Sequence, residues 1–225
     1  MRKSRVFVFL SILAMAAILL GNLSGCGTSK AKPEDPTEGR PSSVSAYEAI
    51  QYTKPVADKW QPRNWMIQVR SGDPDGLGKD GKSKIWEVYF FSPVPEQDAQ
   101  MFVIYNRGNV WPNAPGIPKG GDNGLAVYRK EKPPDFRVDS GEALQVANQN
   151  GGGTYLDSHP DAKADAALRC KADYDAVGEK MPGSKYDWIW DVSYREPRPG
   201  AEVLHVLIDG MNGDFITKNV NAATQ

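Results

Sequence analysis

Three acidic residues lie close together in the stretch Asp73-Pro74-Asp75-Gly76-Leu77-Gly78-Lys79-Asp80. Carboxylates at alternate positions of a short loop can converge on one calcium ion. Counting from Asp73, however, the fifth position is Leu77 and the twelfth is Lys84, where a calcium loop needs an oxygen ligand and a bidentate Glu. We therefore expect a solvated turn here, and no metal site.

Groups for acid/base or nucleophilic chemistry are scattered along the chain. The only histidines are His159, beside a proline, and His205, inside an apolar run. Two isolated histidines do not suggest a metal cluster or an activated nucleophile. Asp187 and Asp191 stay open as an acid/base pair, although such pairs are more often solvated than catalytic. We expect no catalytic residue, no cofactor and no enzyme activity.

The chain has two cysteines, Cys26 and Cys170. Apolar residues recur at every second position from Leu168 to Tyr174, which predicts a strand over 166–174 with Cys170 on its apolar side. A buried structural thiol is the favoured interpretation of Cys170, and a reactive thiol is the alternative.

The first 26 residues follow the pattern of an export signal. Basic residues at positions 2, 3 and 5 precede an apolar run over Val6–Leu20. Leu23-Ser24-Gly25-Cys26 matches the lipobox of bacterial lipoproteins, which implies cleavage between Gly25 and Cys26 and acylation of Cys26 by fatty acids such as palmitate. The alternatives are an uncleaved membrane span and simple secretion.

The charge balance argues against a nucleic-acid partner. The whole chain has 27 basic and 28 acidic residues, and removal of residues 1–25 leaves 24 basic against 28 acidic, a net charge of −4. No basic field remains that would attract phosphates.

Residues 26–43 are rich in proline and in small or charged residues, which predicts a flexible tether between the lipid anchor and the folded part. Ser45-Ala46-Tyr47-Glu48 then has the form of a capping box, so a helix begins here, and we expect it to end or kink near Pro55. Asp139 and Glu142 have the same spacing and predict a second helix start.

After each predicted helix the chain repeats a plan of strand and hairpin, with Trp86-Glu87-Val88 in the first copy and Trp190-Asp191-Val192 in the second. The fold class predicted is α+β, with two tandem modules that each pack one helix on a small antiparallel sheet. Module 1 covers 44–111, a Pro/Gly-rich linker covers 112–135, and module 2 covers 136–220. The aromatic residues of the strand over 186–194 are expected to face the core, with an exposed binding face as the alternative.

The second copy resembles the PepSY family in Glu142-Ala143-Leu144, in Trp190-Asp191-Val192 and in the run from Val206 to Ile216. The first copy is less similar, since its closing turn is only Asn106-Arg107-Gly108-Asn109. The resemblance implies a cystatin-like fold and a non-catalytic module that restrains or binds a peptidase or another envelope protein.

The sequence therefore predicts a lipid-anchored, extracytoplasmic protein of the bacterial envelope that contacts the membrane through Cys26 and binds another protein. The absence of Asp after Cys26 favours the outer membrane, if the cell has one. The alternative function is a carrier of a small molecule or peptide, with a pocket between the modules. Trp60, Trp65 and Trp111 are the candidate contact residues for either function.

Overall fold

The structure is a computed structural model that describes residues 39–93, 99–113, 125–130, 135–176 and 186–222. The chain divides into two compact units, residues 1–36 and 37–225, and all the described residues lie in the second unit. The predicted signal peptide, the cleavage site at Gly25 and Cys26, and most of the tether lie outside the described residues.

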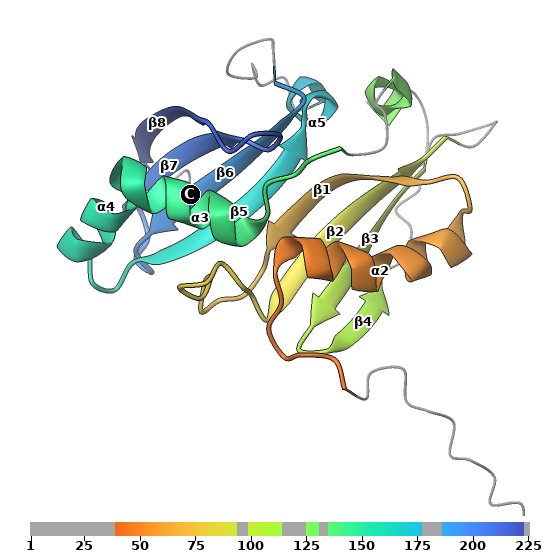
Figure 1. The fold of residues 1–225 in the computed structure, drawn as a ribbon, viewed down its shortest axis with the longest axis horizontal. Helices are drawn as coiled ribbons and strands as arrows, with labels where there is room; N and C mark the ends of the chain where they lie inside the picture. Colours follow the sequence, from red (N-terminus) through yellow and green to blue (C-terminus); the bar gives the residue numbers. More distant parts are fainter. Residues whose placement is uncertain (1–38, 94–98, 114–124, 131–134, 177–185, 223–225) are drawn as a thin grey trace, which may run out of the picture. The chain divides into compact units, whose positions relative to one another are not determined.

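One antiparallel sheet of eight strands runs through the second unit in the order β4-β3-β2-β1-β5-β6-β7-β8 (Figure 1). The prediction of two separate helix-on-sheet modules is wrong, because β1 of the first half pairs directly with β5 of the second, with Val69 opposite Leu168. Both residues are buried. The strands are β1 (Trp65–Ser71), β2 (Ile85–Ser92), β3 (Ala99–Asn106), β4 (Asn109–Pro112), β5 (Lys163–Cys170), β6 (Trp188–Arg195), β7 (Glu202–Asp209) and β8 (Phe215–Ala222).

Helices from both halves lie on one face of this sheet, which we call the front face (Figure 1). The first half contributes α2 (Ala46–Trp60), and the second contributes α3 (Ser140–Ala147), the π-helical turn η2 (Asn148–Gly152) and α4 (Gly153–Ser158). The capping boxes predicted at Ser45 and Asp139 are confirmed. The helix α2 does not end near Pro55 but continues through it to Trp60.

The core between the helices and the sheet is continuous across the two halves. Its largest fully buried side chains include Trp86 and Phe90 from β2 and Trp190 and Tyr194 from β6. The prediction that the aromatic run of the later hairpin faces the core is confirmed for Trp188, Trp190 and Tyr194. A shared core explains why the halves form one layer of sheet rather than two modules, since strands of both halves bury apolar residues under the same helix layer.

Two short helices lie on the opposite face, which we call the rear face. By alternation along β2, Phe91 points away from Trp86 and Phe90, and Tyr128 of η1 (Leu125–Lys130) packs against it with ring centroids 5.6 Å apart. Tyr128 donates a hydrogen bond of 2.8 Å to Asp173 of α5 (Lys171–Ala176). The predicted strand over 166–174 is therefore too long, because the chain turns into α5 after Cys170, which is buried.

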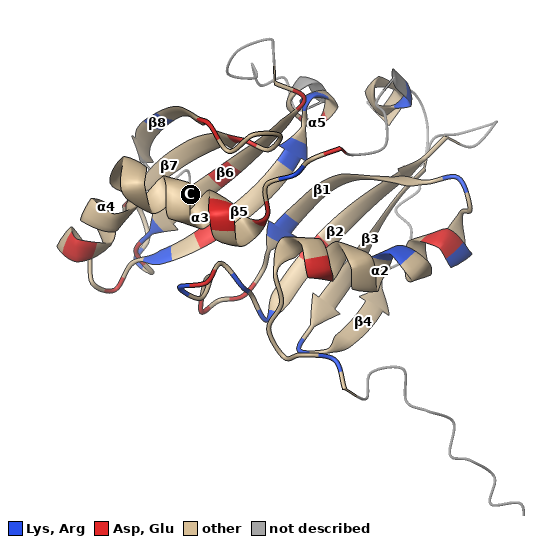
Figure 2. Cartoon of the chain, viewed as in Figure 1, with Lys and Arg blue, Asp and Glu red and all other residues tan. Residues whose placement is uncertain are grey.

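Basic and acidic residues are interspersed over the helices, strands and loops (Figure 2). Among the residues that the structure describes, no helix has the length and apolar character needed to cross a bilayer.

Candidate functional site

The three tryptophans singled out in the sequence lie on different elements. Trp60 ends α2 and is partly buried against the core. Trp65 begins β1, packs edge-on against Phe91 at 5.1 Å, and has a buried indole nitrogen without a hydrogen-bond partner among the described residues. Trp111 lies on the edge strand β4 and is 51% exposed. Of the three, Trp111 is therefore the one placed to touch a partner.

The carrier hypothesis required a pocket between the two halves. Within the sheet, the two halves are joined without a gap by the β1–β5 pairing, in which buried Val69 and Leu168 face each other. None of the three tryptophans lines any of the pockets described below. Pockets that border both halves exist on each face of the sheet, but they are lined by other residues and not by the three tryptophans.

Trp111 belongs to an apolar cluster on the rear face, the Trp111 patch, made of Trp111, Ile104, Phe102 and Tyr89. Trp111 lies directly opposite Ile104 on β3, and Phe102 lies directly opposite Tyr89 on β2. The Phe102 and Tyr89 rings are stacked, with centroids 5.4 Å apart. Because neither α2 nor α3 reaches this face, the side chains of Ile104, Phe102 and Tyr89 remain only partly buried.

A charged cluster borders the Trp111 patch. The Arg70 side chain donates a 2.7 Å hydrogen bond to Glu87, and its guanidinium lies 5.4 Å from the centroid of the Tyr89 ring. The Tyr89 hydroxyl donates to the same Glu87 carboxylate at 2.8 Å. Burial, together with this hydrogen bond, raises the pKa of Tyr89 to about 12. The Arg70 guanidinium thus lies over an aromatic ring, an arrangement found at protein-recognition sites.

The rear face has a hollow of about 540 Å³ at its centre, beside the small side chain of Ala167. Arg70 and Glu87 line one side of it, and Asp191 and Arg195 line the other. Asp191 also contacts His205, with Oδ1 2.9 Å from Nδ1. Sequence reasoning missed this pair, because it results from the register of β6 on β7 and not from spacing along the chain.

One row of residues joins these features, because each residue is the direct cross-strand partner of the next. From the β4 edge to β6, the row is Trp111, Ile104, Glu87, Arg70, Ala167 and Asp191. It combines an aromatic residue, an arginine and alternating charges on one sheet face. Tryptophan, tyrosine and arginine are the residue types that most often anchor protein interfaces.

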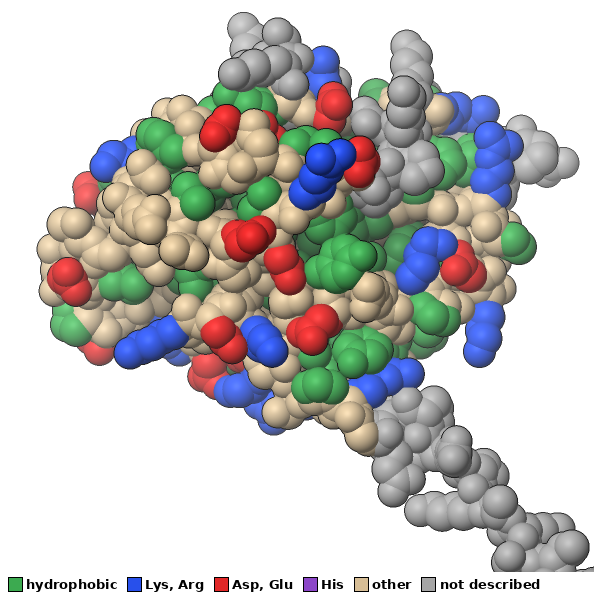
Figure 3. Space-filling view, in the orientation of Figure 1, with side chains coloured by type: hydrophobic (Ala, Val, Ile, Leu, Met, Phe, Trp, Pro, Cys, Tyr) green, Lys and Arg blue, Asp and Glu red, His purple; other side chains and the backbone are tan. Residues whose placement is uncertain are grey.

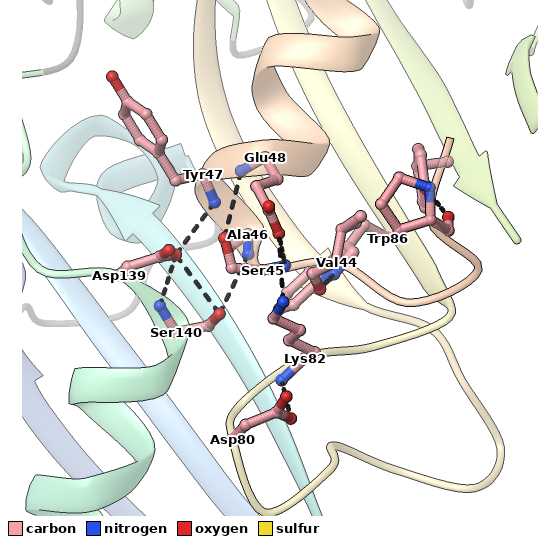
Figure 4. A network of polar contacts seen from close by, with 12 residues as sticks. Val44, Ser45, Ala46, Tyr47, Glu48, Asp80, Lys82, Trp86, Asp139 and Ser140 are labelled. Atoms are coloured by element: carbon pink, nitrogen blue, oxygen red, sulfur yellow. Dashed lines mark hydrogen bonds and ion pairs between the residues drawn. The ribbon is translucent and has the colours of Figure 1, made fainter. Parts of the chain in front are cut away.

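On the front face, the N-termini of α2 and α3 meet (Figure 4). Asp139 accepts hydrogen bonds from the backbone N–H of Ser140 at 2.7 Å and of Tyr47 at 3.0 Å, so one carboxylate caps its own helix and also contacts the other. Ser140 Oγ accepts from the N–H of Ala46 at 3.0 Å. These contacts satisfy helix-terminal donors that would otherwise be available to an anion.

A pocket of about 1220 Å³ opens beside these helix ends. Lys79, Lys82 and Arg137 line it together with Glu48 and Glu142, so neither sign of charge dominates. The same mixture of charged and hydrophobic side chains covers the front face (Figure 3). We assign this region to holding the two halves together.

The acidic loop after β1 is occupied by its own lysine. Asp75 pairs with the ammonium of Lys84 at 2.8 Å, and this contact lowers the pKa of Asp75. Asp73 accepts from the backbone N–H groups of Asp75 and Lys84. The twelfth position of the calcium-like spacing therefore supplies a cation. Among the described residues, no group of three or more His, Cys, Asp or Glu side chains could hold a metal ion.

No protein-family model matches the sequence, and no curated protein matches it. Among solved structures, the chain is similar to a protein from Clostridium difficile 630 whose assignment as a lipoprotein is itself provisional. The two are 11% identical, the TM-score is 0.43, and the match covers 77% of this chain and 93% of the other.

Proposed function

We propose that the chain is a lipid-anchored protein of the bacterial envelope that binds another protein through the rear face of its sheet and catalyses no reaction. The observation that carries the proposal is the row from Trp111 to Asp191, in which a half-exposed tryptophan and an arginine that lies over the ring of Tyr89 share one sheet face. Exposed aromatic groups beside arginine are typical of binding surfaces.

Eight strands leave seven gaps of about 4.8 Å, so the sheet is roughly 34 Å across. The short helices η1 and α5 cover part of the rear face, and the Trp111 patch lies outside that part. A standard interface covers about 800 Å² on each protein. We expect the partner to present an apolar residue to Trp111 and polar groups to the Arg70–Glu87 pair.

The lipid anchor rests on the basic, apolar and lipobox segments that end at Cys26. Labelling cells with radioactive palmitate tests it: the full chain should incorporate label, the Cys26→Ser variant should not, and Cys170→Ser should behave as the wild type. Label retained in Cys26→Ser would contradict the anchor. Where a cell has two membranes, Gly27 after Cys26 favours the outer one, and fractionation of the labelled protein tests this.

An envelope peptidase is the first partner to test, because the PepSY resemblance of residues 139–218 implies one. The full chain is immobilised in detergent and challenged with an envelope extract, in parallel with Trp111→Ser and with Gln149→Ser, a control on the helix layer. We expect a protein that the wild type and Gln149→Ser retain equally and that Trp111→Ser loses. Equal retention by the wild type and both variants would contradict binding through the rear face, and a small molecule that co-purifies without any protein would favour a carrier.

A further inference from the structure

The segment that leads into the sheet from the side of the predicted anchor is fixed to the first half. The Tyr105 hydroxyl donates a hydrogen bond to the backbone carbonyl of Pro41, and the guanidinium of Arg40 lies 5.4 Å from the centroid of the Tyr52 ring. The rings of Tyr52 and Tyr105 are themselves stacked, with centroids 5.5 Å apart. The backbone of Arg40 also lies close to the β3–β4 turn, since a Cβ at Gly108 would be 3.2 Å from its carbonyl oxygen. The chain therefore enters the folded unit at a defined place, beside the β3–β4 turn.

Three basic residues, Arg40, Lys84 and Arg107, lie at this place, and we call them the basic end (Figure 2). Arg107 is exposed in the β3–β4 turn, and its backbone N–H donates to the carbonyl of Lys84 at 2.9 Å. Lys84 pairs with Asp75 at 2.8 Å, and the neighbouring Asp73 is buried. Among the described residues, neither Arg40 nor Arg107 forms an ion pair. These two guanidinium groups therefore keep their charge available to a partner outside the chain.

We propose that the basic end contacts the anionic phosphate groups of the lipids in the membrane that holds Cys26, an inference that rests on the lipid anchor of the proposed function. Gly39, the first described residue, comes thirteen residues after Cys26. A chain of this length spans at most about 45 Å, which is comparable with the width of the sheet. The anchor therefore keeps the lipid headgroups within reach of the end at which the chain enters.

Charge favours this end of the unit over the others. Each Lys or Arg close to an anionic lipid surface strengthens the attraction about fivefold, so Arg40 and Arg107 together supply roughly 25-fold. Guanidinium groups also donate two parallel hydrogen bonds to a phosphate. The attraction fades over about 10 Å, so only groups at the membrane contribute. Because Arg107 is in the turn between two strands, the basic end lies at strand ends, and this orientation leaves the rear face accessible to a protein partner.

Fluorescence quenching by lipids with a paramagnetic headgroup tests the orientation. The full lipidated chain is placed in vesicles of phosphatidylcholine, with or without phosphatidylglycerol, and carries one fluorophore on Ser42→Cys or on Lys59→Cys. Both positions are exposed, and the native Cys170 is buried. Ser42 lies at the basic end, whereas Lys59 is in the last turn of α2, about 20 Å along the helix. Phosphatidylglycerol should raise the ratio of quenching at position 42 to quenching at position 59 several-fold.

Charge variants show which residues cause this ratio. In vesicles with phosphatidylglycerol, Arg40→Gln/Arg107→Gln should lower it to the value in phosphatidylcholine alone, whereas Arg40→Lys/Arg107→Lys should keep it. The matched control is Arg63→Gln/Lys171→Gln, which removes the same charge at the opposite strand ends, before β1 and after β5. This control should leave the ratio unchanged. Circular dichroism melting confirms that each variant folds.

A quenching ratio that does not respond to phosphatidylglycerol would overturn the proposal, as would an equal loss in the two glutamine double variants. Vesicle flotation separates this failure from failure of the anchor. A chain that leaves vesicles of phosphatidylcholine alone would refute the lipid anchor and this proposal together. A chain that stays bound without a preferred end would refute only the contact of the basic end and leave the proposed binding through the rear face untouched.

Discussion

Trp86 and Trp190 make the same contact in the two halves of the sheet. The indole N–H of Trp86 donates to the backbone carbonyl of Val44, and that of Trp190 donates to the carbonyl of Val138, both at 2.9 Å. Each of these carbonyls belongs to the residue just before a helix N-cap. A buried tryptophan therefore fixes the start of each helix on the sheet.

Replacing either tryptophan by alanine should lower the free energy of unfolding by about 3–5 kcal/mol, because a fully buried indole and one hydrogen bond to a backbone carbonyl are lost. Since β1 and β5 join the halves in one sheet, Trp86→Ala and Trp190→Ala should each shift a single transition. Urea denaturation followed by circular dichroism measures this. A transition that splits into two steps would contradict a shared core.

Asp139→Ala should be more destabilising than Ser45→Ala. Loss of an N-cap side chain costs about 0.5–2 kcal/mol. Asp139 caps α3 and also accepts a hydrogen bond from the N–H of Tyr47 in α2, whereas Ser45 caps only its own helix. We therefore expect the destabilisation by Asp139→Ala to lie at the upper end of this range. Asp139→Asn should keep most of the stability, because asparagine is also a good cap. Urea denaturation measures both alanine variants. Equal unfolding midpoints for Asp139→Ala and Ser45→Ala would show that the contact between Asp139 and Tyr47 contributes nothing to stability.

The pH dependence of stability should report on Asp165. Burial raises the pKa of this carboxyl in the folded state, although Arg195 and Ser71 act in the opposite direction. The folded state therefore holds the proton more tightly than the unfolded chain. The contribution of Asp165 to the free energy of unfolding is then fully present at low pH and is lost as pH rises through the folded pKa. Asp165→Asn removes the titration. The melting temperature of Asp165→Asn minus that of the wild type should increase from about pH 4 upward. A difference that stays constant with pH would contradict a raised pKa of Asp165 in the folded state.

Gly152 lies against the ring of Tyr194. A Cβ at Gly152 would come within 2.1 Å of Tyr194 Cζ. Gly152→Ala should therefore lower the free energy of unfolding by about 1–3 kcal/mol through overpacking. Gly200 is the control, because nothing lies within 4 Å of its Cβ position, so Gly200→Ala reports only the cost of its positive φ of 72°. Chemical denaturation of both variants measures the difference, and equal losses would refute the steric explanation.

Local features of the fold could be predicted because their signals lie within a few residues. The capping boxes at Ser45 and Asp139 need only a spacing of three, and the buried side of the strand around Trp190 needs only alternation. The extent of the strand containing Cys170 was wrong, because Ala172 and Tyr174 continue the alternation by chance while the chain enters α5.

The joining of the two halves could not be predicted in this way. Val69 and Leu168 look like residues of any central strand, and nothing local states that they face each other. The same holds for the candidate site. Trp111 was one of three tryptophans named as candidate contacts, but the residues in its row, among them Ile104, Arg70 and Asp191, come from other strands and are brought together by register.

Photo-cross-linking in intact cells tests the central claim, binding through the rear face, most directly. A photoreactive phenylalanine analogue replaces Phe102 or Trp111 on that face, and Gln149 on the helix layer as the control. The account predicts one discrete adduct from positions 102 and 111 and none from position 149. Adducts from position 149 with none from 102 or 111 would contradict it.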